Sequence, residues 1–188
     1  MSARLFTFVG GEIGAWRITR MEAVTGMPLA RAEALDIVQG AAPGESTRAQ
    51  WHLRGITSNE RYIVQDEKAR LVEKQQGLGR PEAVCAALIP IRKSAEWWSL
   101  PQDARRRLFE EDSKHVEIGL RYLPAVARRL HHCRDLGEDE PFDFLTWFEY
   151  ASVAEAAFEE LVRELRASPE WRYVDREIDI RLRRELSQ

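Results

Sequence analysis

The chain contains little cysteine and no cysteine motif. Of its 188 residues only two are cysteines, Cys85 and Cys133, and neither belongs to a CxxC or CxxCH pattern. This argues against a zinc ribbon and against the covalent attachment of a c-type haem. Free cysteine is usually buried, so we expect two reduced and mostly buried thiols.

Long apolar runs and basic tracts are also missing. No window approaches the length of a membrane span, and the first nine residues hold one basic residue and a very short apolar run, which does not make a signal peptide. Charged residues make up 31% of the chain, mix both signs and leave a net charge of -3. We therefore expect a cytoplasmic protein that binds neither nucleic acid nor an anionic membrane.

The chain does have enough apolar residues, 44%, to bury a core in one compact domain or two small fused ones. In its first part, β-prone runs at 5–9 and 15–18 flank a glycine-rich segment and predict a hairpin. Residues 38–50 have loop composition and a strand is expected over 51–56. Residues 59–76 have helical composition and end at the Gly77–Pro81 stop.

The second part has stronger patterns. The apolar run 84–91 predicts a strand that is buried on both faces. Ser99 and Gln102 form a capping box, with Pro101 in the first turn, and predict a helix reaching about Ile118. Residues 124–134 predict a second helix. Residues 142–150 are aromatic and β-prone.

A second capping box begins at Ser152 and predicts a helix. The apolar face of that helix consists of Phe158, Leu161, Val162 and Leu165. From 174 to 182, apolar and charged residues alternate, which predicts a half-buried strand. The pattern indicates an α+β fold, with antiparallel sheets and helices on one face, built from two related halves.

His115 is the histidine that best suits a ligand. It lies late in the helix predicted from Ser99, and Leu108, Asp112 and Gly119 follow helical spacing with it. An imidazole on that face could ligate an iron that lies against the helix. A histidine on such a face is more often a core residue with its hydrogen bonds satisfied, and the pattern alone does not establish a ligand.

Four further residues could form a slot for such a group. Trp97 and Trp98 could provide apolar walls, while Lys93 and Tyr62 could pair with carboxylates at its rim. Ordinary core packing of the tryptophans and a solvated Lys93 at a strand end are the open alternatives.

Several stretches of the sequence closely resemble the short, dimeric lineage of the chlorite dismutases. The stretches are 51–55, 77–83, 86–94 with Trp97 and Trp98, 122–128, 132–135, 142–150 and 176–182. The likeness covers most of 51–182, extends to 1–20 and is poor over 21–50. It implies two ferredoxin-like halves of a dimeric α+β barrel, a truncated one at 1–80 and a haem-binding one at 81–188.

The resemblance assigns roles to individual residues. His115 looks like the proximal haem ligand, and Glu170 like the carboxylate that accepts a hydrogen bond from its far nitrogen. Arg128 matches the distal arginine, and Gln75 the glutamine beside it. The remaining matches lie near the haem propionates: Tyr62, Lys93, Trp97 and the adjacent Trp98.

The implied activity is the conversion of chlorite into chloride and dioxygen by a haem b homodimer. Chlorite would bind the iron opposite His115, an oxygen–chlorine bond would break, and ferryl haem and transient hypochlorite would recombine. The fixed charge of Arg128 would attract the anion and hold the intermediate. Three alternatives remain: a coproheme decarboxylase, which usually lacks that arginine, a weakly peroxidatic haem protein, and a barrel of the same superfamily that binds no haem.

Overall fold

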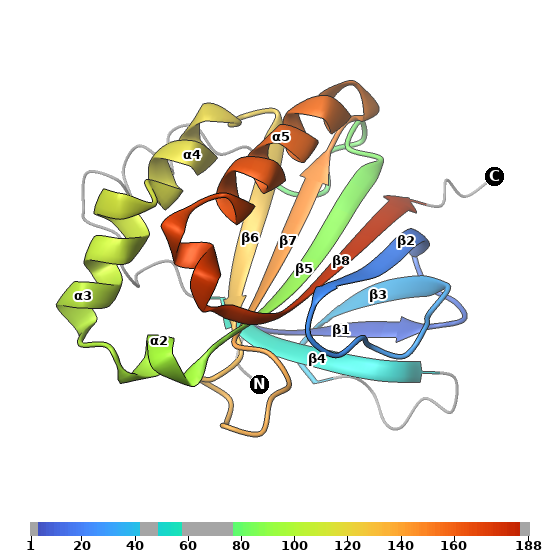
Figure 1. Ribbon diagram of the computed structural model, residues 1–188. Helices are drawn as coiled ribbons and strands as arrows, with labels where there is room; N and C mark the ends of the chain where they lie inside the picture. The colour runs from blue at the N-terminus through green and yellow to red at the C-terminus, as the bar shows by residue number, and fades with distance from the viewer. Residues whose placement is uncertain (1–3, 42–48, 58–76, 185–188) are drawn as a thin grey trace.

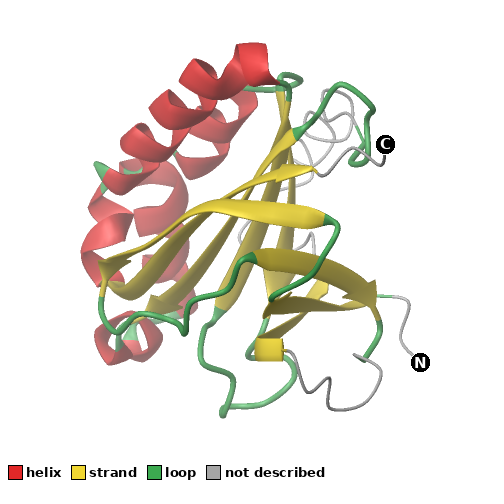
Figure 2. Ribbon diagram, turned by 90° about the vertical axis from the view of Figure 1, so that its right-hand side faces the viewer, coloured by secondary structure: helices red, strands yellow, loops and turns green. Residues whose placement is uncertain are grey.

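The computed structural model describes residues 4–41, 49–57 and 77–184, and its strands form a closed antiparallel barrel in the order β1-β3-β2-β8-β5-β7-β6-β4. The helices lie on one side, over the strands β5 to β8 (Figure 1, Figure 2). The strands are β1 (Leu5–Gly11), β2 (Trp16–Thr25), β3 (Ala34–Gln39), β4 (Ala49–Thr57), β5 (Cys85–Lys93), β6 (Val126–His132), β7 (Phe144–Tyr150) and β8 (Val174–Arg184). This arrangement confirms the expected α+β class.

The helical segments follow β5 and β7 along the chain. They are α2 (Ala95–Ser99), α3 (Gln102–Arg106), the π-helix η1 (Arg107–Asp112), α4 (His115–Arg121), the 3₁₀ turn η2 (Ser152–Ala154), α5 (Glu155–Arg166) and the 3₁₀ turn η3 (Pro169–Tyr173). None of the helices in the described part of the chain is long and apolar enough to cross a membrane.

Two apolar layers hold the fold together. One fills the barrel and includes Phe8, Leu88 and Trp147, and the other lies between the outer face of the barrel and the helices and includes Ile89 and Phe158. The strand β5 contributes to both layers, which confirms the expectation of a strand buried on both faces. Both cysteines are free and buried, as expected.

The predicted N-terminal hairpin is wrong. The strand β1 pairs with β3 and β4, so that Phe8 lies opposite Ile37 and Leu53, whereas β2 pairs mainly with β8. The glycines of this segment allow other parts of the chain to approach the backbone closely, and they do not form a tight turn. A Cβ atom on Gly10 would overlap the Trp51 ring, and one on Gly14 would lie 2.6 Å from the backbone of Leu35.

The helix predicted over 99–118 is interrupted, and its capping box is wrong. The hydroxyl of Ser99 donates to the carbonyl of Glu96, and α3 begins after Pro101 without a side-chain cap. The helical path then widens into the π-helix η1 and breaks at Lys114, whose φ of 51° lies in the left-handed region. His115 consequently begins a new helix instead of lying late in a long one.

The helix predicted over 124–134 is also wrong, because most of this segment is β6. Pairing with β7 along its whole length decides the conformation, from Val126 opposite Tyr150 to His132 opposite Phe144. Arg128 therefore lies on a strand that faces the helices, whereas the next residue, Arg129, points into the barrel toward Phe6.

The last helix and the last strand are confirmed, with one correction each. The predicted apolar face of α5 is buried, but the helix is preceded by a 3₁₀ turn and has no side-chain cap. The strand β8 is buried on both faces rather than on one, because α5 covers Glu177, Asp179 and Arg181 and ion pairs satisfy these side chains.

Candidate functional site

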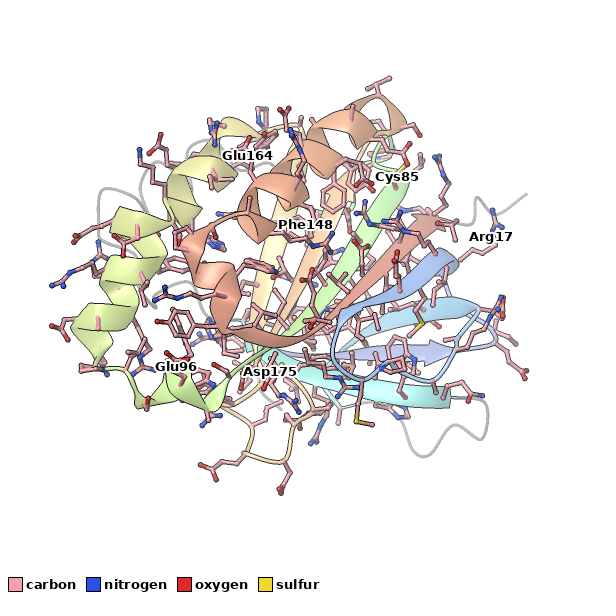
Figure 3. All side chains as sticks on the ribbon, viewed as in Figure 1. Arg17, Cys85, Glu96, Phe148, Glu164 and Asp175 are labelled. Carbon is pink, nitrogen blue, oxygen red and sulfur yellow. The ribbon has the colours of Figure 1, made fainter. Side chains whose placement is uncertain are left out.

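The candidate site is a cavity between the outer face of the barrel and the helices. Two adjoining hollows, with empty volumes of about 560 and 430 Å³, share the lining residues Ile91, His115, Thr146 and Trp171. The strand β6 forms the floor of the cavity. Its alternate residues Arg128, Leu130 and His132 point outward from the barrel and line the cavity. Phe148, which pairs with Arg128, lies beneath α5 (Figure 3).

His115 stands in the wall of both hollows. Its Nδ1 atom lies 2.8 Å from Oε2 of Glu170, and the ring of Phe109 stacks on the imidazole with centroids 4.2 Å apart and an interplanar angle of 22°. The side chain remains 21% exposed, so it is reachable from the cavity. The hydrogen bond to Glu170 leaves Nε2 as the nitrogen that can bind a metal.

Glu170 is buried in the 3₁₀ turn η3, where both carboxylate oxygens and the backbone N–H form hydrogen bonds. Its Oε1 atom accepts a hydrogen bond of 2.6 Å from Nζ of Lys93, and its backbone N–H donates to Oγ of Ser113 at 2.8 Å. Burial alone would raise the pKa of Glu170, but the attraction and hydrogen bonds of His115 and Lys93 lower that pKa to about 2. Glu170 is therefore an ionised partner for His115.

Lys93 ends β5 and is 5% exposed, so it is not a solvated strand end. Its ammonium group lies 4.6 Å from the ring centroid of Trp97 and 5.6 Å from that of Trp171. Asp143 links Lys93 to Trp98, because its Oδ2 atom accepts from the backbone N–H of Lys93 at 2.6 Å and from Nε1 of Trp98 at 3.2 Å. Burial raises the pKa of Asp143 against these hydrogen bonds.

Arg128 lies at the far end of the cavity from Lys93. Its guanidinium packs against Gly119 of α4 so closely that a Cβ atom on the glycine would overlap it. Burial lowers the pKa of Arg128, and the nearby carboxylate of Glu110 opposes that effect. A guanidinium stays protonated in proteins, so the cavity carries a fixed cation.

The structure thus brings five of the eight predicted site residues to one cavity: Lys93, Trp97, His115, Arg128 and Glu170. Trp98 is connected to Lys93 by Asp143, which accepts a hydrogen bond from each. Tyr62 and Gln75 lie outside the described residues.

Sequence reasoning missed Phe109, Ser113, Thr146 and Trp171. The position of Trp171 directly after Glu170 could have signalled its place. No sequence pattern signals Phe109, because it meets His115 only through the π-helical turn.

An imidazole oriented by a buried carboxylate, in the wall of a largely apolar cavity, is the arrangement used by sites that hold a metal-bearing cofactor. The family model described as chlorite dismutase matches residues 30–185. The chain therefore belongs to the chlorite dismutase family.

Individual relatives agree with this assignment. A dimeric chlorite dismutase from Nitrobacter winogradskyi is 53% identical, with a TM-score of 0.87 over 96% of this chain and 99% of that one. A variant chlorite dismutase from Candidatus Nitrospira defluvii, 21% identical with a TM-score of 0.67 over 98% and 92% of the two chains, shares the fold. Chlorite dismutase from Ideonella dechloratans is 32% identical over 123 residues, which are 64% of this chain but only 40% of that relative's length.

Proposed function

We propose that the chain binds haem b through His115 and converts chlorite into chloride and dioxygen, with transient hypochlorite. The observation that carries the proposal is the buried series Lys93–Glu170–His115 in one wall of the cavity, with the cation of Arg128 at its far end. The name of the Nitrobacter relative, which aligns over nearly both whole chains, supports the same activity.

The residues present fit a haem. The lining is mainly apolar and aromatic, including Ile91, Leu130 and Phe144, as a porphyrin face requires. His115 supplies one metal-binding nitrogen, and Lys93 supplies a cation in the same cavity that suits the carboxylates of a haem.

Glu170 would control how strongly His115 donates to the iron. An ionised carboxylate at Nδ1 fixes the tautomer and increases the basicity of the imidazole. His115 and, to a lesser degree, Lys93 keep Glu170 ionised, and Lys93 also holds its other carboxylate oxygen by a hydrogen bond. Since an ammonium group has three donors, Lys93 could bind a propionate as well as Glu170.

Arg128 would act on the substrate. The iron would supply the redox chemistry, whereas the protein supplies orientation and electrostatics. A buried guanidinium attracts the chlorite anion into an apolar cavity and then holds the hypochlorite anion near the place where it is released. We propose Gln75 as its neighbour, and Tyr62, Trp97 and Trp98 as further residues near the propionates.

We also propose the architecture expected from the resemblance, with a truncated ferredoxin-like half at 1–80, a second half at 81–188 and a homodimer. The segment from β5 to β8 supports it, because it runs β-α-β-β-α-β with the strands in the order β8-β5-β7-β6. The relative from Nitrobacter winogradskyi is described as dimeric. The cytoplasmic location stays a prediction.

The test is to load the purified protein with haem b and add chlorite in an oxygen electrode. We expect rapid release of about one dioxygen per chlorite. His115→Ala should lose the histidine-ligated spectrum, and full retention of that spectrum would remove the ligand assignment. Haem uptake without oxygen release would reject the activity, and a mass loss from added coproheme would indicate a decarboxylase instead.

A further inference from the structure

The backbone directly before His115 is unusual in two consecutive ways. Residues Arg107–Asp112 form a π-helix, and the N–H of Ser113 closes it with a hydrogen bond of 3.1 Å to the carbonyl of Leu108, five residues earlier. Lys114 then adopts the left-handed conformation, which is strained for any residue with a side chain. Such departures persist where the surroundings enforce them, and they concentrate at functional sites.

The π-helix brings Phe109 onto the imidazole of His115. In a regular α-helix two residues six positions apart point about 120° away from each other. Here their rings are nearly parallel, at 22°, with centroids 4.2 Å apart. The stacking restricts rotation of the imidazole out of its plane, whereas the hydrogen bond of Nδ1 to Glu170 fixes a direction within that plane.

The residue that ends the π-helix also holds Glu170. The side chain of Ser113 is 3% exposed, and its Oγ accepts the backbone N–H of Glu170 at 2.8 Å. This hydrogen bond ties the turn before His115 to the turn that carries its carboxylate partner, although the two are 57 residues apart in the chain.

We propose that the π-helical turn is a positioning device for the axial ligand, in which Phe109 fixes the plane of the His115 imidazole and Ser113 fixes the carboxylate of Glu170. Both are positioning residues, because they act through His115 and Glu170. The inference rests on the proposed function, since the ligand role of His115 belongs to that proposal.

The first test replaces Phe109 in the haem-loaded full chain. Phe109→Leu keeps apolar volume but removes the ring, and the imidazole plane should become variable. We expect a changed spread of g-values in the electron paramagnetic resonance spectrum of the ferric cyanide adduct, and a broadened iron–histidine stretch in the ferrous Raman spectrum. Phe109→Tyr, which keeps the ring, should restore both signals.

Phe6→Leu is the matched control, because Phe6 also contacts a histidine, His131, with ring centroids 5.3 Å apart, but does so inside the barrel. It should leave both spectra unchanged. If Phe109→Leu takes up no haem, Phe109→Met replaces it in the same measurements.

The second test addresses Ser113. Ser113→Ala should lower the iron–histidine stretching frequency, because a less constrained Glu170 supports the imidazole less well. It should also speed haem transfer to excess apomyoglobin by about tenfold, the scale on which partners of metal ligands act. Ser113→Thr keeps the hydroxyl and should restore both values, and Ser99→Ala, which removes an exposed hydroxyl, should change neither.

The results separate this inference from the proposed function. Wild-type spectra in both Phe109→Leu and Ser113→Ala would overturn the positioning role while leaving His115 as the ligand. A wild-type protein whose haem shows no iron–histidine stretch would overturn the ligand assignment itself, before any variant is compared.

Discussion

Gly119 makes room for the guanidinium of Arg128. A Cβ atom on this glycine would overlap Nη1 and lie 2.7 Å from Cζ and Nη2. Gly119 belongs to α4, the helix that begins at His115, so one short helix carries the candidate ligand and also forms the surface against which the candidate distal cation rests. The absence of a side chain at 119 therefore sets where the positive charge lies.

Gly119→Ala should displace Arg128 and lower chlorite turnover. Alanine favours a helix by about 1 kcal/mol over glycine, so a loss of activity here would not follow from a weaker helix. A misplaced catalytic group can cost about 100-fold, and we expect a fall of about tenfold to 100-fold in kcat/KM with haem still bound. Oxygen release and the haem spectrum measure the two effects.

Two variants bracket that measurement. Gly137→Ala should leave turnover unchanged, because a Cβ atom at that glycine would meet nothing within 4 Å. Arg128→Ala should set the lower limit, with haem retained, a reduced oxygen yield and hypochlorite released. Wild-type turnover in Gly119→Ala would show that the position of the guanidinium does not matter.

Glu170→Gln should weaken haem binding and raise the reduction potential of the iron. Glutamine keeps the shape but removes the charge, so His115 becomes a weaker donor and Lys93 loses its buried counterion. We expect haem affinity to fall by about tenfold to 100-fold. Spectroelectrochemistry and haem transfer to apomyoglobin give the two quantities.

The control for Glu170→Gln is Glu164→Gln. Glu164 bonds Arg121 and Tyr122 between α5 and the α4 region, outside the cavity (Figure 3). Its variant should keep the wild-type potential. An equal shift in both variants would assign the effect to a general loss of negative charge, and not to the contact with His115.

Some elements were predictable from the sequence because a local pattern determines them. The run that became β5 is apolar at almost every position, which is what burial on two faces requires. The face of α5 that includes Phe158 and Leu165 follows the helical period.

Other elements were not predictable, because distant partners determine them. The arginine and histidine residues of β6 obscure the alternation of apolar and polar side chains that would predict a strand. Pairing with β7 decides its conformation. The break at Lys114 has no glycine or proline to announce it, and it exists where Ser113 meets Glu170.

The same reasoning applies to the site. The sequence alone predicts that Glu170 is a solvent-exposed carboxylate. Its contacts in the buried site are made with Ser113 and Lys93, which lie 57 and 77 residues away in the chain. Arg128 is preceded by alanine and followed by Arg129, which is a pattern typical of a solvated face. The family resemblance supplied both residues, and the structure supplies the contacts that account for their place.

Arg166→Ala should destabilise the fold strongly. Its guanidinium donates to Oε1 of Glu177 at 2.6 Å and to Oδ2 of Asp179 at 2.9 Å, and both carboxylates are buried. Removing one partner of a buried pair costs about 3–5 kcal/mol. The charge left without its ion pair here is that of Glu177, since Asp179 keeps its contact with Arg181. Urea denaturation should show this loss.

Arg163→Ala is the comparison on the same helix. Arg163 pairs with Glu160 at the surface, and exposed pairs contribute about 0–1 kcal/mol. A similar loss in both variants would show that the buried location of the Arg166 pairs adds nothing.

His131 should make the fold less stable in mild acid. It is fully buried in the barrel, where Nδ1 is 3.0 Å from the carbonyl of Leu145 and Nε2 accepts a hydrogen bond from Arg129, so the ring is neutral. Burial, and to a lesser degree the charge of Arg129, lowers the pKa of His131 from 6.5 to about 4. Between these values the unfolded chain binds a proton that the folded protein does not. Stability from this group is therefore complete above about pH 6.5 and is lost as the pH falls.

From about pH 7 to about pH 4.5 this group should remove about 2–3 kcal/mol from the free energy of unfolding. Glutamine cannot titrate in this range, so the free energy of unfolding of His131→Gln should fall by about 2–3 kcal/mol less than that of the wild type. Its value at neutral pH should be lower than that of the wild type, because packing and a hydrogen bond change. Urea denaturation of the haem-free protein at several pH values measures the difference. His52→Gln, at an exposed position of β4, should keep the wild-type dependence. If His131→Gln lost as much stability in acid as the wild type, the acid sensitivity would have to come from other groups, and the buried imidazole would not be its source.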